Sequence, residues 1–339
     1  MKEENLYVDH LSISFTEDGG KVIAVDDVSF TMEKGEILGV IGESGCGKST
    51  LALSIMNLLP ENTSGIDYGK ILFNGVDLTK LSEEELENIR GNKISMIFQE
   101  PMTSLNPLFK IGRQVGEPLK IHRNLYGKEL KEKVMELLKT VHISRPEKVY
   151  DSYPHNLSGG MRQRVMVAMA LSCEPDILIA DEPTTALDVT IQAQILNLLK
   201  KLNKKNNTSI LFITHDLSVV SEICDKVMVL YGGKIVEYTD IYELFDNPKH
   251  PYTIALLESQ PHMFEEGTRL PSIKGMVPSL SEMPKGCRFS NRCSKKFCEK
   301  CNIEQPPIYI LDNNHKVSCW LYEEEAKKNE SLDIESRTS

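Results

Sequence analysis

The sequence has 339 residues, of which 40% are hydrophobic and 26% are charged, a composition typical of folded globular proteins and unlike that of disordered or collagen-like chains. Acidic residues outnumber basic ones, 49 to 39, so the formal net charge of −10 argues against general binding to nucleic-acid phosphates. No run approaches the ~18 uncharged apolar residues of a membrane-spanning helix, and the N-terminus has no apolar stretch of signal-peptide length, so we expect a cytosolic protein.

The N-terminal part of the chain is predicted to form strands. Residues 1–40 alternate apolar and polar side chains, with Leu11, Ile13 and Phe15 on one face, and the turn sequence at 18–20 separates this stretch from a second extended pattern at 22–30. The short apolar run at 36–41 then predicts a buried strand, and residues 48–59 a helix. The order is therefore strand, glycine-rich loop, helix.

The rest of the first 245 residues alternates between the two kinds of element. Residues 100–175 contain helical segments such as 128–141, interrupted by Pro and Gly, which predicts a mostly helical insert. Buried strands are predicted at 177–180 and 210–214, with an amphipathic helix near 190–202 between them. Such alternation indicates an α/β fold with a parallel sheet.

The length is consistent with two domains. From about residue 246 the alternation is lost and prolines become frequent. We place one domain at 1–245 and a smaller one at 246–321. Residues 322–339 are polar and charged with little apolar content, which predicts a disordered tail.

A phosphate-binding motif occupies the loop after the strand at 36–41. Residues 42–49 read GESGCGKS, which fits G-x-x-x-x-G-K-[ST] between a strand and a helix. In this motif backbone N–H groups surround phosphate oxygens, Lys48 reaches the β and γ phosphates, and Ser49 can bind Mg²⁺. The alternative is a purely structural glycine-rich turn, and the motif together with its context outweighs it.

An acidic pair follows the predicted strand at 177–180. Asp181 is placed to hold magnesium, and Glu182 at the strand tip to act as general base toward a water molecule. Two acids after a strand are also common helix-capping residues, which would be the better interpretation without the upstream phosphate loop.

With the segment LSGGMRQ at 157–163, the chain resembles the nucleotide-binding subunits of ABC transporters. Ser158 and the two glycines open a helix whose N–H groups point outward, an anion site without its own lysine. The resemblance implies that this segment closes on ATP held by a second, homologous ATPase subunit. It also implies a RecA-like core with an antiparallel β subdomain and a helical subdomain.

Further positions match the family in order. Gln99 matches the glutamine that senses magnesium, His215 the switch histidine, and residues 186–188 the loop exchanged across the dimer. Phe15 takes the place of the aromatic that stacks on adenine, although it is equally compatible with a core position. The resemblance thus implies catalytic roles for Glu182, His215, Gln99 and Lys48, and magnesium ligands Ser49, Gln99 and Asp181. The implied ATP contacts are Phe15, Gly42, Glu43, Ser44, Gly45, Cys46, Gly47, Lys48, Ser49, Thr50, Ser158, Gly159, Gly160 and Gln163.

The substrate class rests on finer resemblance. Residues 99–107, together with HPYT at 250–253, PSL at 278–280 and GCRF at 286–289, resemble ATPase subunits of oligopeptide and dipeptide importers. This implies two transmembrane permease subunits, an extracellular peptide-binding protein, and a peripheral location on the cytoplasmic face of the membrane. The alternatives are an importer of nickel or another solute, or a soluble ABC ATPase acting on nucleic acid or ribosomes, which the single nucleotide domain and the acidic charge disfavour.

Five of the eight cysteines fall between residues 287 and 319. A cytosolic disulfide scaffold is disfavoured, and the spacing lacks the paired knuckles of a zinc ribbon, although zinc stays possible. Nearby lysines and arginines are expected to favour thiolates. The resemblance implies a [4Fe-4S] cluster on four cysteines, with packed reduced thiols as the alternative. The expected ligands are Cys287, Cys293, Cys301 and Cys319, with Cys298 as a possible substitute.

Overall fold

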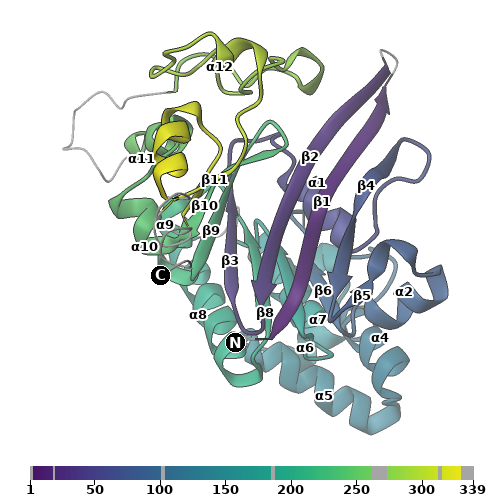
Figure 1. The fold of residues 1–339 in the computed structure, drawn as a ribbon. Coiled ribbons are helices and arrows are strands. Elements are labelled where there is room, and N and C mark those ends of the chain that lie inside the picture. Colours follow the sequence, from purple (N-terminus) through teal and green to yellow (C-terminus); the bar gives the residue numbers. More distant parts are fainter. Residues whose placement is uncertain are drawn as a thin grey trace, which may run out of the picture.

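The computed structural model describes residues 3–17, 20–100, 104–184, 188–260, 273–311 and 315–329. Within these ranges the strands form two sheets (Figure 1). The smaller sheet is antiparallel, and its long hairpin of β1 and β2 confirms the extended pattern expected before residue 40. Its order is β2 (Gly20–Glu33), β1 (Glu4–Glu17), β4 (Ser64–Phe73) and β5 (Val76–Asp77).

The larger sheet has a parallel centre, as the alternation of strands and helices predicts. Strands β9, β3, β8, β7 and β6 are parallel neighbours, and β10 pairs antiparallel with β9. The described strands follow the order β11 (Tyr309–Ile310), β12 (Lys316–Val317), β10 (Lys234–Asp240), β9 (Lys226–Tyr231), β3 (Ile37–Ile41), β8 (Ser209–Ile213), β7 (Ile177–Asp181) and β6 (Ile94–Ile97).

The core lies on both faces of the parallel strands. In β3, Leu38 and Val40 pack toward the antiparallel sheet, whereas Ile37 and Ile41 pack toward the helical side. All five residues of β3 are buried, because a parallel sheet covered on both faces needs apolar side chains at every position. This explains why the strand appears in the sequence as a continuous apolar run.

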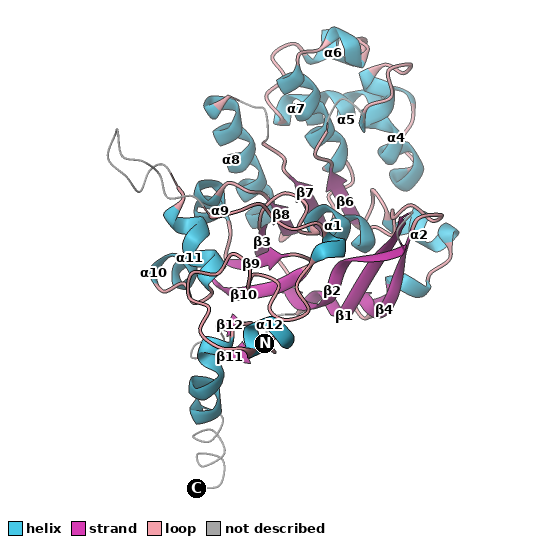
Figure 2. Cartoon of the chain, turned by 90° about the horizontal axis from the view of Figure 1, so that it is seen from above, coloured by secondary structure: helices cyan, strands magenta, loops and turns pink. Residues whose placement is uncertain are grey.

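Helices α4 to α7 gather on one side of the molecule, opposite α12 (Figure 2). They form the helical insert expected at 100–175. Helix α1 ends at Ile55, earlier than the predicted residue 59, because Asn57 adopts a positive φ of 49°. The helices are α1 (Lys48–Ile55), α2 (Glu83–Ile89), α4 (Ile111–Arg123), α5 (Gly127–Thr140), α6 (Pro146–Tyr150), α7 (Gly159–Ala170), α8 (Val189–Asn206), α9 (Leu217–Ile223), α10 (Ile241–Asp246), α11 (Pro251–Glu258) and α12 (Lys300–Ile303).

The C-terminal part of the chain is attached to the larger sheet. Strand β12 pairs with β10, and the buried carboxylate of Glu237 on β10 contacts His315 Nε2 at 2.6 Å. The expected disorder of 322–339 is wrong for its first part: residues 323–329 are helical, because Ala326 finds a buried place against Leu311 and Val317. Residues 330–339 lie outside the described ranges. Among the described helices, none is both long and apolar enough to cross a membrane.

His250 makes the stability of this region dependent on pH. Its ring is buried, accepts a hydrogen bond from the Tyr252 N–H at 3.0 Å, and lies 5.9 Å from the Phe289 ring. Burial lowers the pKa of His250 from 6.5 to about 4. The unfolded chain therefore binds more protons between these two values, so stability is lost as the pH falls through this window.

Because protonation of His250 favours the unfolded chain, we expect the free energy of unfolding to fall by up to about 3 kcal/mol as the pH drops below the ordinary histidine range. The His250→Asn variant keeps a hydrogen-bond acceptor for the N-terminus of α11 but has no group that titrates in this range. Its free energy of unfolding should therefore depend less on pH. Urea denaturation of both proteins from neutral pH to about pH 5 measures the difference. Identical slopes would show that His250 is not the titrating group.

Candidate functional site

The loop between β3 and α1 has the conformation that a phosphate-binding loop requires. Gly45 and Gly47 have φ values of 80° and 100°, which L-residues with side chains rarely adopt. A Cβ at Gly47 would also lie 2.5 Å from the Ala24 carbonyl oxygen. The backbone thus turns sharply into α1, so the helix N-terminus and its free N–H groups face the loop.

Lys48 is held within this loop. Its Nζ donates to the carbonyl oxygens of Gly42 at 2.7 Å and Glu43 at 3.0 Å, and the side chain is buried. Neither acceptor carries a charge, so an anion of the size of a phosphate is a favourable additional partner for the ammonium.

Asp181, at the end of β7, is suited to a cation. It is buried, and its Oδ1 has no hydrogen-bond partner. Burial raises the pKa of this carboxyl, as does the charge of Glu182, while a hydrogen bond from Ser49 and the charge of Lys48 act in the opposite direction. A divalent cation would satisfy the orphaned oxygen and stabilise the charged carboxylate, so these residues fit the magnesium expected from the sequence.

Glu182 and His215 lie beside each other. The His215 Nδ1 is 3.2 Å from Glu182 Oε1, although the two residues follow different strands, β7 and β8. Glu182 has a φ of 47°, an uncommon backbone conformation for a residue other than glycine. Such strain is found at functional sites, where the surrounding structure holds a side chain in a required direction.

Many of the predicted nucleotide residues line one cavity of about 200 Å³. Phe15 lines it from β1, Gln99 from the end of β6, and Glu182 from the end of β7. Ala24 of β2 and Leu280 of the C-terminal part also line this cavity, and the sequence analysis did not identify either. The other lining residues are Ser44, Gly45, Gly47, Lys48, Ser49 and Thr50.

Some predicted contacts do not line that cavity. Gly42 and Glu43 border a neighbouring cavity together with His215, and Cys46 is buried in the core. The prediction for Gln163 needs correction: its side chain is 1% exposed and donates to the Pro183 carbonyl oxygen at 2.7 Å, so it faces the protein interior rather than a second subunit.

The LSGGMRQ segment lies at a different cavity. Ser158 caps α7 by accepting from the Met161 N–H, and Ser158 and Gly159 are exposed. Ser158 and Gly160 line a cavity of about 360 Å³ that also includes Asp188 and contains no residue of the phosphate loop. Residues 186 and 187 of the predicted exchanged loop lie outside the described residues.

Comparisons with known proteins identify the family. The ABC transporter model matches residues 25–185, and the model for the oligopeptide/dipeptide transporter C-terminal region matches residues 236–301. The oligopeptide transport ATP-binding protein AppD of Bacillus subtilis (strain 168) is 51% identical over 94% of this chain and 97% of its own length. The chain belongs to the ATP-binding subunits of oligopeptide and dipeptide ABC transporters.

Other relatives agree with this assignment. The dipeptide transport ATP-binding protein DppD of the same strain is 48% identical to this ABC ATPase, over 96% of this chain and 97% of the relative. Among solved structures, a dimeric ATP-binding cassette in a post-hydrolysis state with ADP and Pi is 28% identical with a TM-score of 0.64. The matched region covers 70% of this chain and 98% of the cassette's chain.

Four cysteines of this ABC ATPase line one narrow cavity in the C-terminal part, and Cys298 does not line it. Cys298 lies behind Cys301, with their Sγ atoms 3.6 Å apart. As the side chains stand, no three His, Cys, Asp or Glu residues of the described ranges are arranged to hold a metal ion. The cavity-lining cysteines are Cys287, Cys293, Cys301 and Cys319.

Burial outweighs the expected effect of nearby cations on three of these thiols. Burial raises the pKa of Cys287 to about 11 and of Cys319 to about 12, and it also raises the pKa of Cys293. Lys295 and Lys296 lower the pKa of Cys293, but by less than burial raises it. Three further cations pair with carboxylates: Arg288 with Asp26, Arg292 with Glu43 and Lys300 with Glu323. Cys287, Cys293 and Cys319 are therefore protonated at neutral pH in this structure.

Proposed function

We propose that this ABC ATPase drives peptide import by closing on a second, homologous ATPase subunit, with ATP held between the phosphate loop of one subunit and Ser158 to Gly160 of the other. One observation carries this proposal: the loop and the LSGGMRQ segment line separate cavities of the same chain. Each is half of an anion site, and a second subunit supplies the missing half.

Within the loop, Lys48 binds the β and γ phosphates after exchanging its carbonyl acceptors for phosphate oxygens. Ser49, Asp181 and Gln99 hold Mg²⁺, which supplies charge neutralisation at the phosphates. Support comes from the partnerless Oδ1 of Asp181 and from the position of Gln99 on the same cavity. Phe15, which lines the same cavity and is only partly buried, stacks on the adenine.

Glu182 accepts a proton from the attacking water, and His215 orients its carboxylate. Their 3.2 Å contact supports this pairing. His215 also borders the neighbouring cavity together with Glu43 of the phosphate loop, so a shift of the loop would change the surroundings of His215. Phosphoryl transfer depends mainly on positioning and on charge stabilisation, which such fixed groups provide.

The ATPase works at the cytoplasmic face of the membrane on two permease subunits, with a peptide-binding protein on the other side and no nucleic acid. The names of the relatives, which refer to oligopeptide and dipeptide transport, support this assembly. Residues 1–245 form the nucleotide domain and 246–321 the C-terminal domain, and the movement passes to the permeases through the region after Gln99. A partner subunit that is homologous rather than identical gives a heterodimer.

The C-terminal domain holds a [4Fe-4S] cluster on Cys287, Cys293, Cys301 and Cys319. Their shared cavity and their thiol chemistry support this ligand set. Binding would release the protons that burial retains on Cys287, Cys293 and Cys319, and the four side chains would have to rearrange to bring their sulfurs to the iron atoms.

The Glu182→Gln variant tests the catalytic assignment. We expect its ATP turnover to fall by about a hundredfold or more while its affinity for Mg·ATP stays near the wild-type value, because the amide cannot accept the proton but keeps the shape of the site. Steady-state hydrolysis and binding of a fluorescent ATP analogue give the two quantities. Unchanged hydrolysis in this variant would reject Glu182 as the base.

The cysteine assignment is tested by anaerobic purification with iron analysis and absorbance near about 400 nm, where such clusters absorb. The Cys301→Ser variant is expected to lose iron, whereas Cys298→Ser, a neighbouring thiol outside the cavity, should retain it. Wild-type protein without iron would exclude the cluster. Loss of iron in Cys298→Ser alone would reassign the third ligand.

A further inference from the structure

Arg292 of the C-terminal part makes a two-pronged ion pair with the phosphate loop. Its Nη1 lies 2.5 Å from Glu43 Oε2, and its Nη2 lies 3.0 Å from Glu43 Oε1. The Arg292 side chain is 5% exposed and that of Glu43 is 28% exposed, so the arginine end of the pair is shielded from solvent. Bidentate pairs between Arg and a carboxylate fix both distance and orientation.

The arginine is itself held firmly. Its Nε donates to the Lys274 carbonyl oxygen at 3.0 Å and its Nη2 to that of Gly275 at 3.1 Å. Nη1 also donates to the Tyr231 hydroxyl at 3.3 Å, at the end of β9. These hydrogen bonds fix the orientation of the guanidinium, and the guanidinium in turn fixes the position of the Glu43 carboxylate.

Glu43 connects Arg292 to the phosphate-binding Lys48. Its N–H donates to the buried Tyr252 hydroxyl at 2.8 Å, and its carbonyl oxygen accepts from Lys48 Nζ at 3.0 Å. A displacement of Glu43 would therefore move an acceptor of Lys48 and change the path of the loop. The carboxylate is bonded to Arg292, and Glu43 lines the neighbouring cavity, not the nucleotide cavity.

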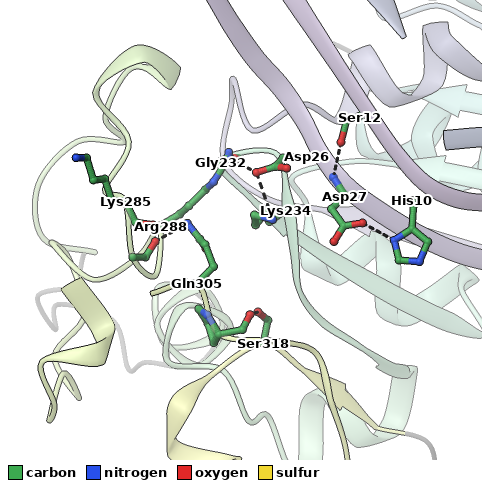
Figure 3. A network of polar contacts seen from close by, with 12 residues as sticks. His10, Ser12, Asp26, Asp27, Gly232, Lys234, Lys285, Arg288, Gln305 and Ser318 are labelled. Carbon is green, nitrogen blue, oxygen red and sulfur yellow. Dashed lines mark hydrogen bonds and ion pairs between the residues drawn. The ribbon is translucent and has the colours of Figure 1, made fainter. Parts of the chain in front are cut away.

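A second arginine of the same segment also joins the C-terminal part to the first 245 residues. Arg288 bonds to Asp26 on β2 and to the Gly232 carbonyl oxygen, and Asp26 also pairs with Lys234 at 3.2 Å (Figure 3). The segment 287–293 thus bridges β2, the turn after β9, and the phosphate loop. Leu280 of the same C-terminal part lines the nucleotide cavity as well.

We propose that Arg292 is a positioning residue for ATP binding: through Glu43 it holds the phosphate loop in the form that accepts Mg·ATP, so the C-terminal part sets the nucleotide affinity of the cassette. This inference rests on ATP binding at the proposed site, and it adds a contribution from outside the nucleotide domain. A role in stability alone would lower the melting temperature without changing the affinity of the folded protein.

The experiment compares full-length Arg292→Gln, Arg292→Lys and Glu43→Gln with Lys300→Gln, which breaks an exposed ion pair of the C-terminal part that does not touch the loop. For Arg292→Gln we expect KM for ATP and Kd for a fluorescent ATP analogue to rise about five- to tenfold, with kcat within about twofold. Arg292→Lys should be intermediate, because it keeps the charge but loses the fork. Lys300→Gln should behave as wild type.

The double variant Arg292→Gln/Glu43→Gln separates coupling from independent effects. We expect its Kd to match that of either single variant, since both remove the same interaction. Multiplicative effects of the two substitutions, or equal shifts in Arg292→Gln and Lys300→Gln, would overturn the inference. If Arg292→Gln does not fold, Glu43→Gln alone must raise Kd.

The inference and the proposed function fail in different ways. If wild-type protein hydrolyses ATP and Lys48→Ala abolishes nucleotide binding, the proposed site stands, and a normal Kd in Arg292→Gln and Glu43→Gln then rejects only the positioning role. If Lys48→Ala binds and hydrolyses ATP as wild type does, the proposed site itself is wrong.

Discussion

Parallel pairing of β3, β7 and β8 is the constraint on which the nucleotide site depends. Gly39 of β3 is paired with Phe212 of β8, and Asp181 of β7 with Ile213 of β8, so the carboxyl ends of the three strands meet at one edge. The loop that follows β3, the acid at the end of β7 and the histidine after β8 are thereby brought together. Slippage of one strand would separate groups that the proposed mechanism needs at the same phosphate.

Short stretches of neighbouring residues were enough to predict this part of the fold. The apolar run of β3 directly precedes the glycine-rich loop, and the loop directly precedes α1, so neighbouring residues carried the information. The run at 177–180 predicted β7 for the same reason. Phe15 was different, because its place on the cavity depends on how the antiparallel sheet lies against the parallel one, and only the resemblance suggested it.

The features that the sequence did not predict depend on long-range packing. Arg292 and Glu43 are 249 positions apart, and no periodicity relates them. Gln163 falls within a signature that suggested an exposed role, yet the turn of α7 directs it toward Pro183. The protonated state of Cys287 likewise follows from burial and from arginines that pair elsewhere, which charge counting along the chain does not reveal.

The central claim is that one chain contains two half-sites, completed only by a facing ATPase subunit. A cryo-electron microscopy structure of the assembled transporter with Mg·ATP and Glu182→Gln in this subunit tests it most directly. We expect ATP on the phosphate loop, a cation beside the partnerless Oδ1 of Asp181, and the facing subunit's signature segment closed over the γ-phosphate. ATP bound elsewhere, or bound at the loop with that segment turned away in every particle class, would contradict it.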